Sequence, residues 1–376
     1  MKLLHVYSGN LYGGAEAFLA ALGAFAGSLS AEQHFALCFE GRLSRELETA
    51  GVPVHQLGEA RVRYPWTVRR ARSRLRDVMR THRIDGVMFH STWAYALFAA
   101  TARQMDRTVA LYLHGPARGT HWLDRLARRV TPDVLIANSA YTAAVSAEMF
   151  AGVPASIVAC PVPAPPAFEA DTRLAVRQEL GIGDDAVMIV QASRMEPFKG
   201  HRELLHALAA LRDVPSWVCC IVGGPQRPAE EAYYAELVAL PATLGIADRV
   251  HFTGERRDVR RLLAAADIHC QPNTAPDAFG IAFVEAMYAG LPVVTTGLGG
   301  ALEVVDEHSG ILVPSGEARA LASALAILIH EPATRHRLGA HGPSRAAALC
   351  DTATQCQRLV DVVTDRITLT RASTPA

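Results

Sequence analysis

Two carboxylates stand eight positions apart in one segment, Asp277 before a Phe-Gly turn and Glu285 within the apolar run that follows. Eight residues make a little over two helical turns, so a carboxylate in the loop and one on the following helix can face the same side. Gly280 and the amides after it open this helix, and helix starts bind anions. Because carboxylates hold sugar hydroxyls and free amides hold phosphate, the segment predicts a site for a sugar attached to a diphosphate. The competing interpretation is an ordinary amphipathic helix-to-strand unit of an α/β protein.

Two basic residues in another loop suit the phosphate part of such a ligand. Of the 37 lysines and arginines in the chain, only Lys2 and Lys199 are lysines. Lys199 shares a loop with Arg194, directly after the apolar run 187–190, which predicts a strand. Arginine offers a planar fork and lysine a compact point charge, and doubly wound sheets bind ligands at the carboxyl ends of their strands. The pair is therefore predicted to grip a leaving diphosphate, against the alternative of two solvated loop cations.

These two segments resemble elements of one enzyme family. Residues 276–294 resemble the Glu-x7-Glu motif of the retaining glycosyltransferases with the GT-B fold, specifically family 4 (glycosyl transferases group 1). The loop from Arg194 to Gly200 resembles the Arg-x4-Lys-Gly element whose two cations hold the donor pyrophosphate. The chain departs from the pattern at Asp277, which replaces the first Glu and is one methylene shorter. That difference bears on the identity of the donor sugar more than on the reaction class.

The resemblance extends to residues that carry weaker signals by themselves. Gly13, Gly14 and Glu16 resemble a Gly-Gly-x-Glu loop that lies beside donor and acceptor, and they lack the glycine spacing of a dinucleotide site. His114 matches a histidine that approaches the donor sugar, and His90, which also follows a strand, is expected on the acceptor side. For both histidines the alternative is a structural role. The catalytic set implied is His114, Arg194, Lys199, Asp277 and Glu285, and the remaining donor-binding residues are Gly224, Arg256, Phe279, Gly280, Ile281 and Ala282, with Gly299 and Gly300 near the phosphate.

The implied reaction is hexosyl transfer from a UDP- or GDP-sugar to a glycan, a glycolipid or another hydroxyl acceptor, in cell-envelope or polysaccharide biosynthesis. Arg194, Lys199 and the helix amides would bind the diphosphate more tightly as its charge develops. No metal or other cofactor is expected, because two cations already neutralise that charge. The resemblance implies that the anomeric configuration of the sugar is retained without a covalent sugar–enzyme intermediate. The departing phosphate would take the proton of the acceptor hydroxyl.

Apolar strand-like runs alternate with helical patterns along the whole chain, which predicts an α/β protein with parallel sheets. A chain of 376 residues exceeds what one core usually supports. A segment with four prolines in seven residues, 160–166, predicts a stiff break between two domains. We therefore expect Rossmann-like domains at 1–165 (acceptor side) and 166–350 (nucleotide-sugar side), facing across a cleft, and a returning helix within 351–376 followed by a frayed tail from 368. The expected strands are 3–7, 34–38, 86–89, 109–113, 134–137, 186–190, 218–222, 250–252, 268–271 and 293–295.

Composition and charge restrict the partners and the cellular compartment that can be expected. The formal net charge is zero, which gives no electrostatic case for nucleic acid. The seven cysteines form no Cys-x-x-Cys pair, so neither a disulfide framework nor a zinc site is indicated, and a reducing cytoplasm fits. Residues 61–83 hold nine arginines and one aspartate. This segment is either a basic amphipathic helix or a solvated helix face. In the first case, its apolar stripe of Val68, Leu75, Val78 and Met79, beside Tyr64 and Trp66, contacts the inner face of an anionic membrane.

Rival functions share parts of this pattern. An inert nucleotide-sugar-binding partner subunit is compatible with the substitution at Asp277, and a nucleotide-sugar epimerase or a phosphorylase is compatible with the fold. A phosphorylase needs a lysine for pyridoxal, and an NAD-dependent reductase needs the absent glycine fingerprint. The base, the sugar, the acceptor and the oligomeric state are left open by the sequence.

Overall fold

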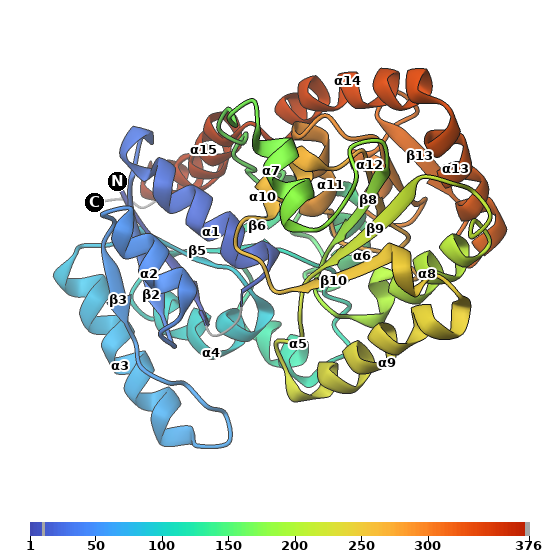
Figure 1. The fold of residues 1–376 in the computed structure, drawn as a ribbon. Helices are drawn as coiled ribbons and strands as arrows, with labels where there is room; N and C mark the ends of the chain where they lie inside the picture. Colours follow the sequence, from blue (N-terminus) through green and yellow to red (C-terminus); the bar gives the residue numbers. More distant parts are fainter. Residues whose placement is uncertain (10–11, 373–376) are drawn as a thin grey trace. The chain divides into compact units, whose positions relative to one another are not determined.

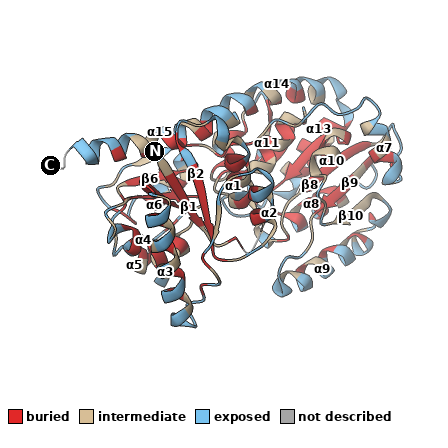
Figure 2. Ribbon diagram, turned by 90° about the vertical axis from the view of Figure 1, so that its left-hand side faces the viewer, coloured by how far each residue is buried: buried red, intermediate tan, exposed pale blue. Residues whose placement is uncertain are grey.

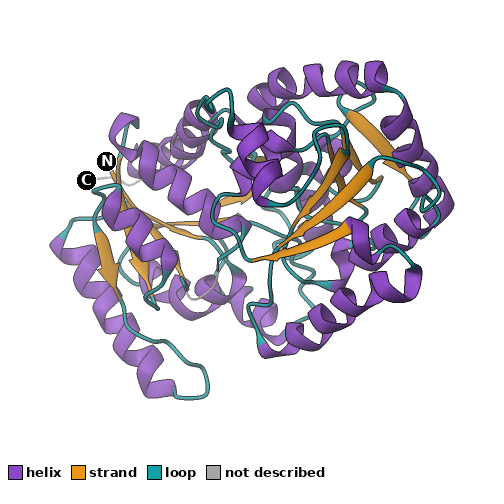
Figure 3. Ribbon diagram, viewed as in Figure 1, coloured by secondary structure: helices purple, strands orange, loops and turns teal. Residues whose placement is uncertain are grey.

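The computed structural model describes residues 1–9 and 12–372, which form two compact units. Unit 1 comprises Met1–Pro163 and the chain from Cys350 onward, and unit 2 comprises Ala164–Leu349. The division falls inside the proline-rich segment, which contains no helix or strand. Each unit contains a parallel sheet with helices packed on its faces (Figures 1 and 3).

Within its described residues, unit 1 has a seven-stranded parallel sheet in the order β3-β2-β1-β4-β5-β6-β7. The central strands are buried along nearly their whole length, as expected for strands covered on both faces. Their bounds are β1 Lys2–Tyr7, β2 Glu32–Leu37, β3 Val54–Gln56, β4 Gly86–Phe89, β5 Thr108–Leu113, β6 Val134–Ala137 and β7 Ala155–Ile157.

The helices of unit 1 connect these strands, and the last helix of the chain returns to the same unit. They are α1 Gly14–Phe25, η1 Ala26–Ser28, α2 Arg42–Thr49, α3 Pro65–Thr81, α4 Thr92–Arg103, α5 Trp122–Ala127, α6 Ala140–Ser146 and α15 Thr352–Ala372. Helix α15 packs against α1 and strands β4, β5 and β6 (Figure 1). The prediction of a frayed tail from residue 368 is wrong for residues 368–372, because helix α15 continues to Ala372, with Ile367 buried near its end. Residues 373–376 lie outside the described part.

Unit 2 has a six-stranded parallel sheet in the order β10-β9-β8-β11-β12-β13, and all of its residues are described. Its strands are β8 Val187–Ala192, β9 Trp217–Val222, β10 Val250–Gly254, β11 Ile268–Gln271, β12 Val293–Thr296 and β13 Gly310–Val313. Its helices are α7 Thr172–Glu179, η2 Pro197–Lys199, α8 His201–Ala209, α9 Pro228–Leu244, η3 Ala247–Arg249, α10 Val259–Ala265, α11 Ile281–Tyr288, α12 Ala301–Val304, α13 Ala318–His330 and α14 Pro332–Cys350.

All the strands predicted from the sequence are present, with ends that differ by at most two residues. Strands β3, β7 and β13 were not predicted. Each of them lies at an edge of its sheet and is three or four residues long. Edge strands are short and less apolar because only one side is paired, so their sequence signal is weak.

The strand order places a switch point in each sheet. In unit 1, the chain places β2 and β3 on one side of β1 and then crosses to the other side with β4. In unit 2, it places β9 and β10 on one side of β8 and then crosses to the other side with β11. Open α/β sheets bind ligands outside the carboxyl ends of the strands at such a point. The loops that follow β1 and β4 in unit 1, and β8 and β11 in unit 2, are therefore the places where a site is expected.

Each unit has its own apolar core between sheet and helices, and buried residues concentrate in the strands while the outward helix faces are exposed (Figure 2). One ion pair is built into the base of the unit 2 sheet. Arg177 is 1% exposed, and its Nη2 lies 2.6 Å from Oδ2 of Asp267. The same carboxylate oxygen accepts from the amide of Met188 at 2.8 Å, so the pair joins α7 to the starts of β8 and β11. A charge buried this deeply is tolerated because it is paired and hydrogen-bonded.

Candidate functional site

The loops after β8 and β11 bring two predicted site residues into contact. Nζ of Lys199 donates to Oδ2 of Asp277 at 2.6 Å. The side chains are 13% and 18% exposed, so the pair is largely screened from solvent. These residues are 78 positions apart in the chain and meet because β8 and β11 are neighbours in the sheet. We refer to Arg194, Lys199, Asp277, Gly280 and Glu285 as the unit 2 site.

Gly200 lets the loop that carries Lys199 pack against the loop that follows β11. Its φ of +78° lies in the left-handed region, and a Cβ there would lie 1.9 Å from the carbonyl oxygen of Pro272. Gln191 donates from Nε2 to the carbonyl of Lys199 at 2.8 Å. Only glycine permits this backbone approach, so the position of Lys199 depends on the residue that follows it.

The position of Asp277 depends on the glycine pair at 299–300. Asp277 and Gly299 form a parallel bridge, and the amide of Gly300 donates to the carbonyl of Asp277 at 2.9 Å. A Cβ on Gly299, whose φ is +59°, would lie 2.5 Å from that carbonyl. The second carboxylate oxygen of Asp277 accepts from the amide of Ala278 at 2.9 Å. The carboxylate is therefore fixed from two sides.

Gly280 opens helix α11, as predicted. Its φ is +102°, and a Cβ there would lie 2.3 Å from the ring of Phe283. Phe279 is buried before it, while Ile281 and Ala282 in the first helical turn are partly exposed. The first amides of a helix have no acceptor within the helix, and the helix dipole adds partial positive charge there. This end of α11 can therefore bind an anion.

Glu285 lies on α11 with its side chain 29% exposed, and its Oε1 is 4.0 Å from Nε of Arg260. Burial raises the pKa of this carboxyl above its usual range, and the charge of Arg260 opposes the shift only in part. A carboxyl in such surroundings gains from hydrogen bonds to hydroxyl groups. Arg260 is a neighbour that the sequence did not single out.

The two predicted arginines differ in what they already bind. Nη2 of Arg194 lies 2.9 Å from Oε2 of Glu196, and 39% of the arginine side chain is exposed. Arg256 uses Nε and Nη2 for Asp258, both at 2.8 Å, and Nη1 for Glu179 at 2.7 Å. These carboxylates raise the pKa of Arg256 and occupy its fork. A phosphate would have to displace one of them, whereas Arg194 keeps an exposed side. Gly224, at the end of β9, packs beside the backbone of Glu255.

In unit 1 the glycine loop lies after β1, as predicted, although residues 10–11 of that loop lie outside the described part. Gly13 precedes α1, which begins at Gly14, and its amide donates to Oε2 of Glu16 at 2.9 Å. Glu16 is 4% exposed. The carboxylate thus holds the start of its own helix and places negative charge at a switch point.

His90 and His114 follow β4 and β5, and they belong to a row of hydrogen-bonded polar side chains in which His5, Gln33 and His90 are buried and His114 is partly exposed. Nδ1 of His90 is 3.0 Å from Nε2 of His114, and Nε2 of His90 is 2.9 Å from Nδ1 of His5. Nε2 of His5 in turn lies 2.7 Å from Oε1 of Gln33, whose amide nitrogen donates to the carbonyl of Ala31. We refer to His5, His90 and His114 as the histidine chain, and to Gly13, Gly14, Glu16, His90 and His114 as the unit 1 site.

The hydrogen bonds assign the tautomers along the histidine chain. Because Gln33 presents its oxygen, Nε2 of His5 carries the hydrogen and Nδ1 accepts. His90 then donates from Nε2 and accepts at Nδ1, and His114 donates from Nε2. The lone pair of His114 is therefore on Nδ1, which suits it to accept a hydrogen bond from a hydroxyl. His5 and Gln33 were missed from the sequence, although polar residues inside apolar strands are a signal for such networks.

In the described part of these loops, potential metal ligands do not gather in groups of three. Among residues 1–9 and 12–372, three histidine, cysteine or acidic side chains converge suitably at one place only, His34, His55 and His82, none of which belongs to the unit 1 or unit 2 site. Ser139 caps helix α6, since its hydroxyl accepts from the amide of Thr142 at 3.0 Å.

Family models match the chain in two pieces. Residues 172–345 match the family described as glycosyl transferases group 1, and residues 12–163 match glycosyltransferase family 4. The first stretch contains the unit 2 site, and the second contains the unit 1 site.

Curated relatives carry out sugar transfer. The GDP-mannose-dependent alpha-(1-6)-phosphatidylinositol monomannoside mannosyltransferase of Mycolicibacterium smegmatis is 30% identical over 313 residues, 78% of this chain and 80% of that protein. The D-inositol 3-phosphate glycosyltransferase of Stackebrandtia nassauensis is 32% identical over 225 residues, 57% of this chain. That match spans 50% of the length of the Stackebrandtia protein.

Solved structures share the fold. HepE of Anabaena, solved in complex with UDP and glucose, is 24% identical with a TM-score of 0.85, covering 97% of this chain and 99% of that one. A glycosyltransferase of Rickettsia africae is 16% identical with a TM-score of 0.86, covering 97% and 98%. The likeness confirms the predicted GT-B architecture of two Rossmann-like parallel-sheet domains.

The histidine chain predicts acid sensitivity. Burial lowers the pKa of His5 to about 4 and that of His114 to about 3, and it holds the pKa of His90 well below its usual range. Histidines of the unfolded chain titrate near pH 6.5, so above that pH these rings are neutral in both states and the free energy of unfolding is at its full value. As the pH falls from 6.5 toward 4, the unfolded chain takes up protons that the folded protein excludes. The free energy of unfolding then decreases by about 1.4 kcal/mol per histidine per pH unit. Urea unfolding at pH 7.5 and 5.5 measures the loss.

The substitution His5→Phe tests this assignment, because a phenyl ring can keep the stacking of His5 on Phe35. The variant is expected to be less stable at both pH values but to lose less stability between them. His308→Phe, at an exposed histidine, is the control and should leave the pH dependence unchanged. An equal pH dependence in His5→Phe and the wild type would contradict the neutral assignment of His5.

Proposed function

Because the chain belongs to the family 4, or group 1, glycosyltransferases, we propose that it moves a hexose from a GDP- or UDP-sugar to a hydroxyl of a lipid-linked acceptor in envelope biosynthesis. The Mycolicibacterium smegmatis relative, whose name specifies GDP-mannose and phosphatidylinositol monomannoside, supports this class of donor and acceptor. The complex of HepE with UDP and glucose belongs to a protein of the same fold and supports a UDP-sugar as the second donor to test.

The contact between Lys199 and Asp277 at the start of α11 carries the proposal. The ammonium group has three donors, of which Asp277 takes one at 2.6 Å, so the others can reach phosphate oxygens. Arg194, with 39% of its side chain exposed, adds a planar fork. The amides that follow Gly280 supply further donors. Together these groups form a cationic cradle at the switch point, where a nucleotide diphosphate binds in α/β sheets.

In the proposed reaction, the bond between the anomeric carbon and the diphosphate breaks while negative charge builds on the departing oxygen. The cradle lowers the barrier because it binds this charge more tightly in the transition state than in the ground state. Glu285, whose pKa is raised by burial, holds a donor sugar hydroxyl. Asp277, committed to Lys199, keeps the ammonium in place. In unit 1, Nδ1 of His114 is proposed to accept a hydrogen bond from a substrate hydroxyl, and no metal takes part.

Removing the charge of Lys199 tests the donor site. Lys199→Met is expected to lose the rise in melting temperature that GDP-mannose or UDP-glucose gives the wild type, and to lower turnover by about 100-fold, because one charged donor to the leaving group is absent. Lys2→Met is a matched control at the other lysine, which pairs with Glu32 in unit 1. Equal ligand stabilisation in Lys199→Met and wild type would refute the site. Ligand binding without turnover for any acceptor would favour an inert binding subunit.

The stereochemistry of the product tests the mechanism. With an α-linked donor, retention predicts an α-linked product, because the acceptor attacks the face that the phosphate leaves. The departing phosphate accepts the acceptor proton, so no side chain needs to become a nucleophile. The one-bond carbon–proton coupling constant at the anomeric centre of the product, read by NMR, distinguishes the outcomes for glucosides and mannosides alike. A β-linked product from an α-linked donor would exclude the proposed step.

The acceptor side is proposed to meet a membrane surface through the start of α3. The apolar stripe predicted for that role is not available, because Val68, Leu75 and Met79 are buried in the unit 1 core. Arg72 and Arg74 also bond backbone carbonyls of Leu97 and Leu57. The exposed apolar groups are instead Val62, Tyr64 and the 65%-exposed Trp66, among exposed arginines at 61, 63, 69 and 70. None of the described helices is long and apolar enough to cross a membrane.

Sedimentation with anionic vesicles tests this contact. Each basic residue near such a surface contributes about 1 kcal/mol, and an interfacial aromatic pair adds apolar contact. The wild type is expected to sediment with phosphatidylglycerol vesicles at low salt, and Tyr64→Ser with Trp66→Ser to stay largely in solution. Trp122→Ser, at another exposed tryptophan, is the matched control. Wild-type protein that remains in solution at low salt would remove the membrane contact without affecting the donor site.

A further inference from the structure

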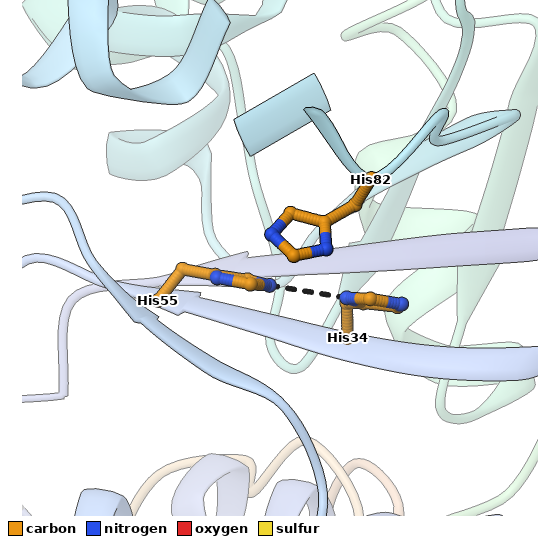
Figure 4. A group of neighbouring side chains, drawn as sticks. All are labelled: His34, His55 and His82. Carbon is orange, nitrogen blue, oxygen red and sulfur yellow. Dashed lines mark hydrogen bonds between the residues drawn. The ribbon is translucent and has the colours of Figure 1, made fainter. Parts of the chain in front are cut away.

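Three histidine side chains converge in unit 1, on the edge of the sheet formed by β2 and β3. They are His34 from β2, His55 from β3 and His82 directly after α3, and one ring nitrogen of each lies within 4.8 Å of the others. Nδ1 of His34 is 3.0 Å from Nε2 of His55. Figure 4 shows the two rings lying nearly edge to edge along this contact, with the ring of His82 over them.

The strand register produces this arrangement. His55 is paired with Ala36, so His34, two residues before Ala36, lies diagonally across from His55 on the same face of the sheet. Helix α3 covers this face, where Ala36 packs in the core with Leu75 and Met79. The helix ends at Thr81, and His82 caps it with its amide bonded to the carbonyl of Val78. The helix end therefore brings the third ring onto the strand pair.

We propose that His34, His55 and His82 bind a divalent transition metal of the zinc type. Imidazole nitrogen is a preferred ligand for Zn²⁺, and three histidines with a water molecule are an established coordination set. With Zn–N distances of about 2.1 Å, tetrahedral ligand nitrogens are about 3.4 Å apart. The 3.0 Å contact of His34 with His55 is close to this spacing, and the ligand nitrogens of all three rings lie within 4.8 Å of one another. Rotation of the rings, with the proton of His55 moving from Nε2 to Nδ1, would let all three face one ion.

Glu32 supplies the supporting contact that metal-binding histidines require. Its Oε1 lies 2.8 Å from Nε2 of His34, so this nitrogen carries the hydrogen and Nδ1, facing His55, carries the lone pair. Lys2 holds the other carboxylate oxygen at 2.9 Å. A carboxylate on the far ring nitrogen fixes the tautomer and raises the basicity of the ligand.

The exposure of the three rings leaves room for a fourth ligand. His34 is 1% exposed, whereas His55 and His82 are partly exposed. One side of the group is therefore anchored in the core and the other reaches solvent, where water completes the coordination. The ion would connect the edge strand β3, which pairs only with β2, to the end of the arginine-rich helix α3. It would stabilise this edge of unit 1, and the inference does not rest on the sugar-transfer reaction.

The experiment uses the full-length, tag-free chain stripped of metal with a chelator. Zn²⁺ is titrated by calorimetry, melting temperature is measured with and without Zn²⁺, and Co²⁺ absorption reports the coordination. The wild type is expected to bind one Zn²⁺, to melt at a higher temperature with it, and to give the intense visible bands of four-coordinate Co²⁺. Hydrogen exchange in β3 and at residue 82 should slow on binding.

Substitutions at the partly exposed ligands avoid disturbing the core. His55→Gln and His82→Gln are each expected to abolish stoichiometric binding, and Glu32→Gln to weaken it by about 10-fold while the fold is retained. His308→Gln with His341→Gln is the matched control, because these rings of unit 2 lie 5.5 Å apart and should have no effect. Wild-type protein that binds no Zn²⁺ at micromolar concentration would overturn the proposal. Unchanged Zn²⁺ affinity in both His55→Gln and His82→Gln would overturn it equally.

Discussion

The unit 2 site depends on a backbone contact between two loops. Gly200 approaches the carbonyl of Pro272 so closely that a Cβ would lie 1.9 Å from its oxygen. This contact brings the loop after β8 to the loop after β11 and lets Lys199 reach Asp277 across 78 residues of sequence. A larger residue at 200 would separate the loops and, with them, the two charges. The charge arrangement is therefore a consequence of backbone packing.

The switch point of unit 1 carries a different kind of side chain. It places neutral, hydrogen-bonded histidines at the carboxyl ends of β4 and β5 and buries the supporting residues His5 and Gln33 inside the sheet. Polar groups inside a core are tolerated only when their hydrogen bonds are satisfied. The histidine chain meets this requirement and also determines which nitrogen of His114 can accept a hydrogen bond. Lys199 and Arg194 of unit 2 thus present positive charge suited to a diphosphate, and the histidine chain of unit 1 presents a neutral acceptor suited to a hydroxyl group.

Several contacts changed the interpretation of residues chosen from the sequence. Arg256 lies near the expected loop, but its fork is filled by Asp258 and Glu179. The apolar stripe of α3 faces the sheet, so any membrane contact must use the exposed residues at the start of that helix. Neither result is visible in residue type or periodicity, because both depend on which surface the rest of the chain covers.

The sequence by itself determined the parallel α/β architecture, the long central strands, and the glycine and charged residues of the loops at 13–16, 194–200 and 277–285. These features follow from local physics, since apolar runs require burial, and glycines permit backbone conformations that other residues disfavour. Only the tertiary structure decided that Lys199 bonds Asp277, that His5 orients His90, and that His34 meets His55 and His82. Each of these contacts depends on the lateral order and register of strands distant in sequence. That order is set by packing of the whole sheet, which no local pattern encodes.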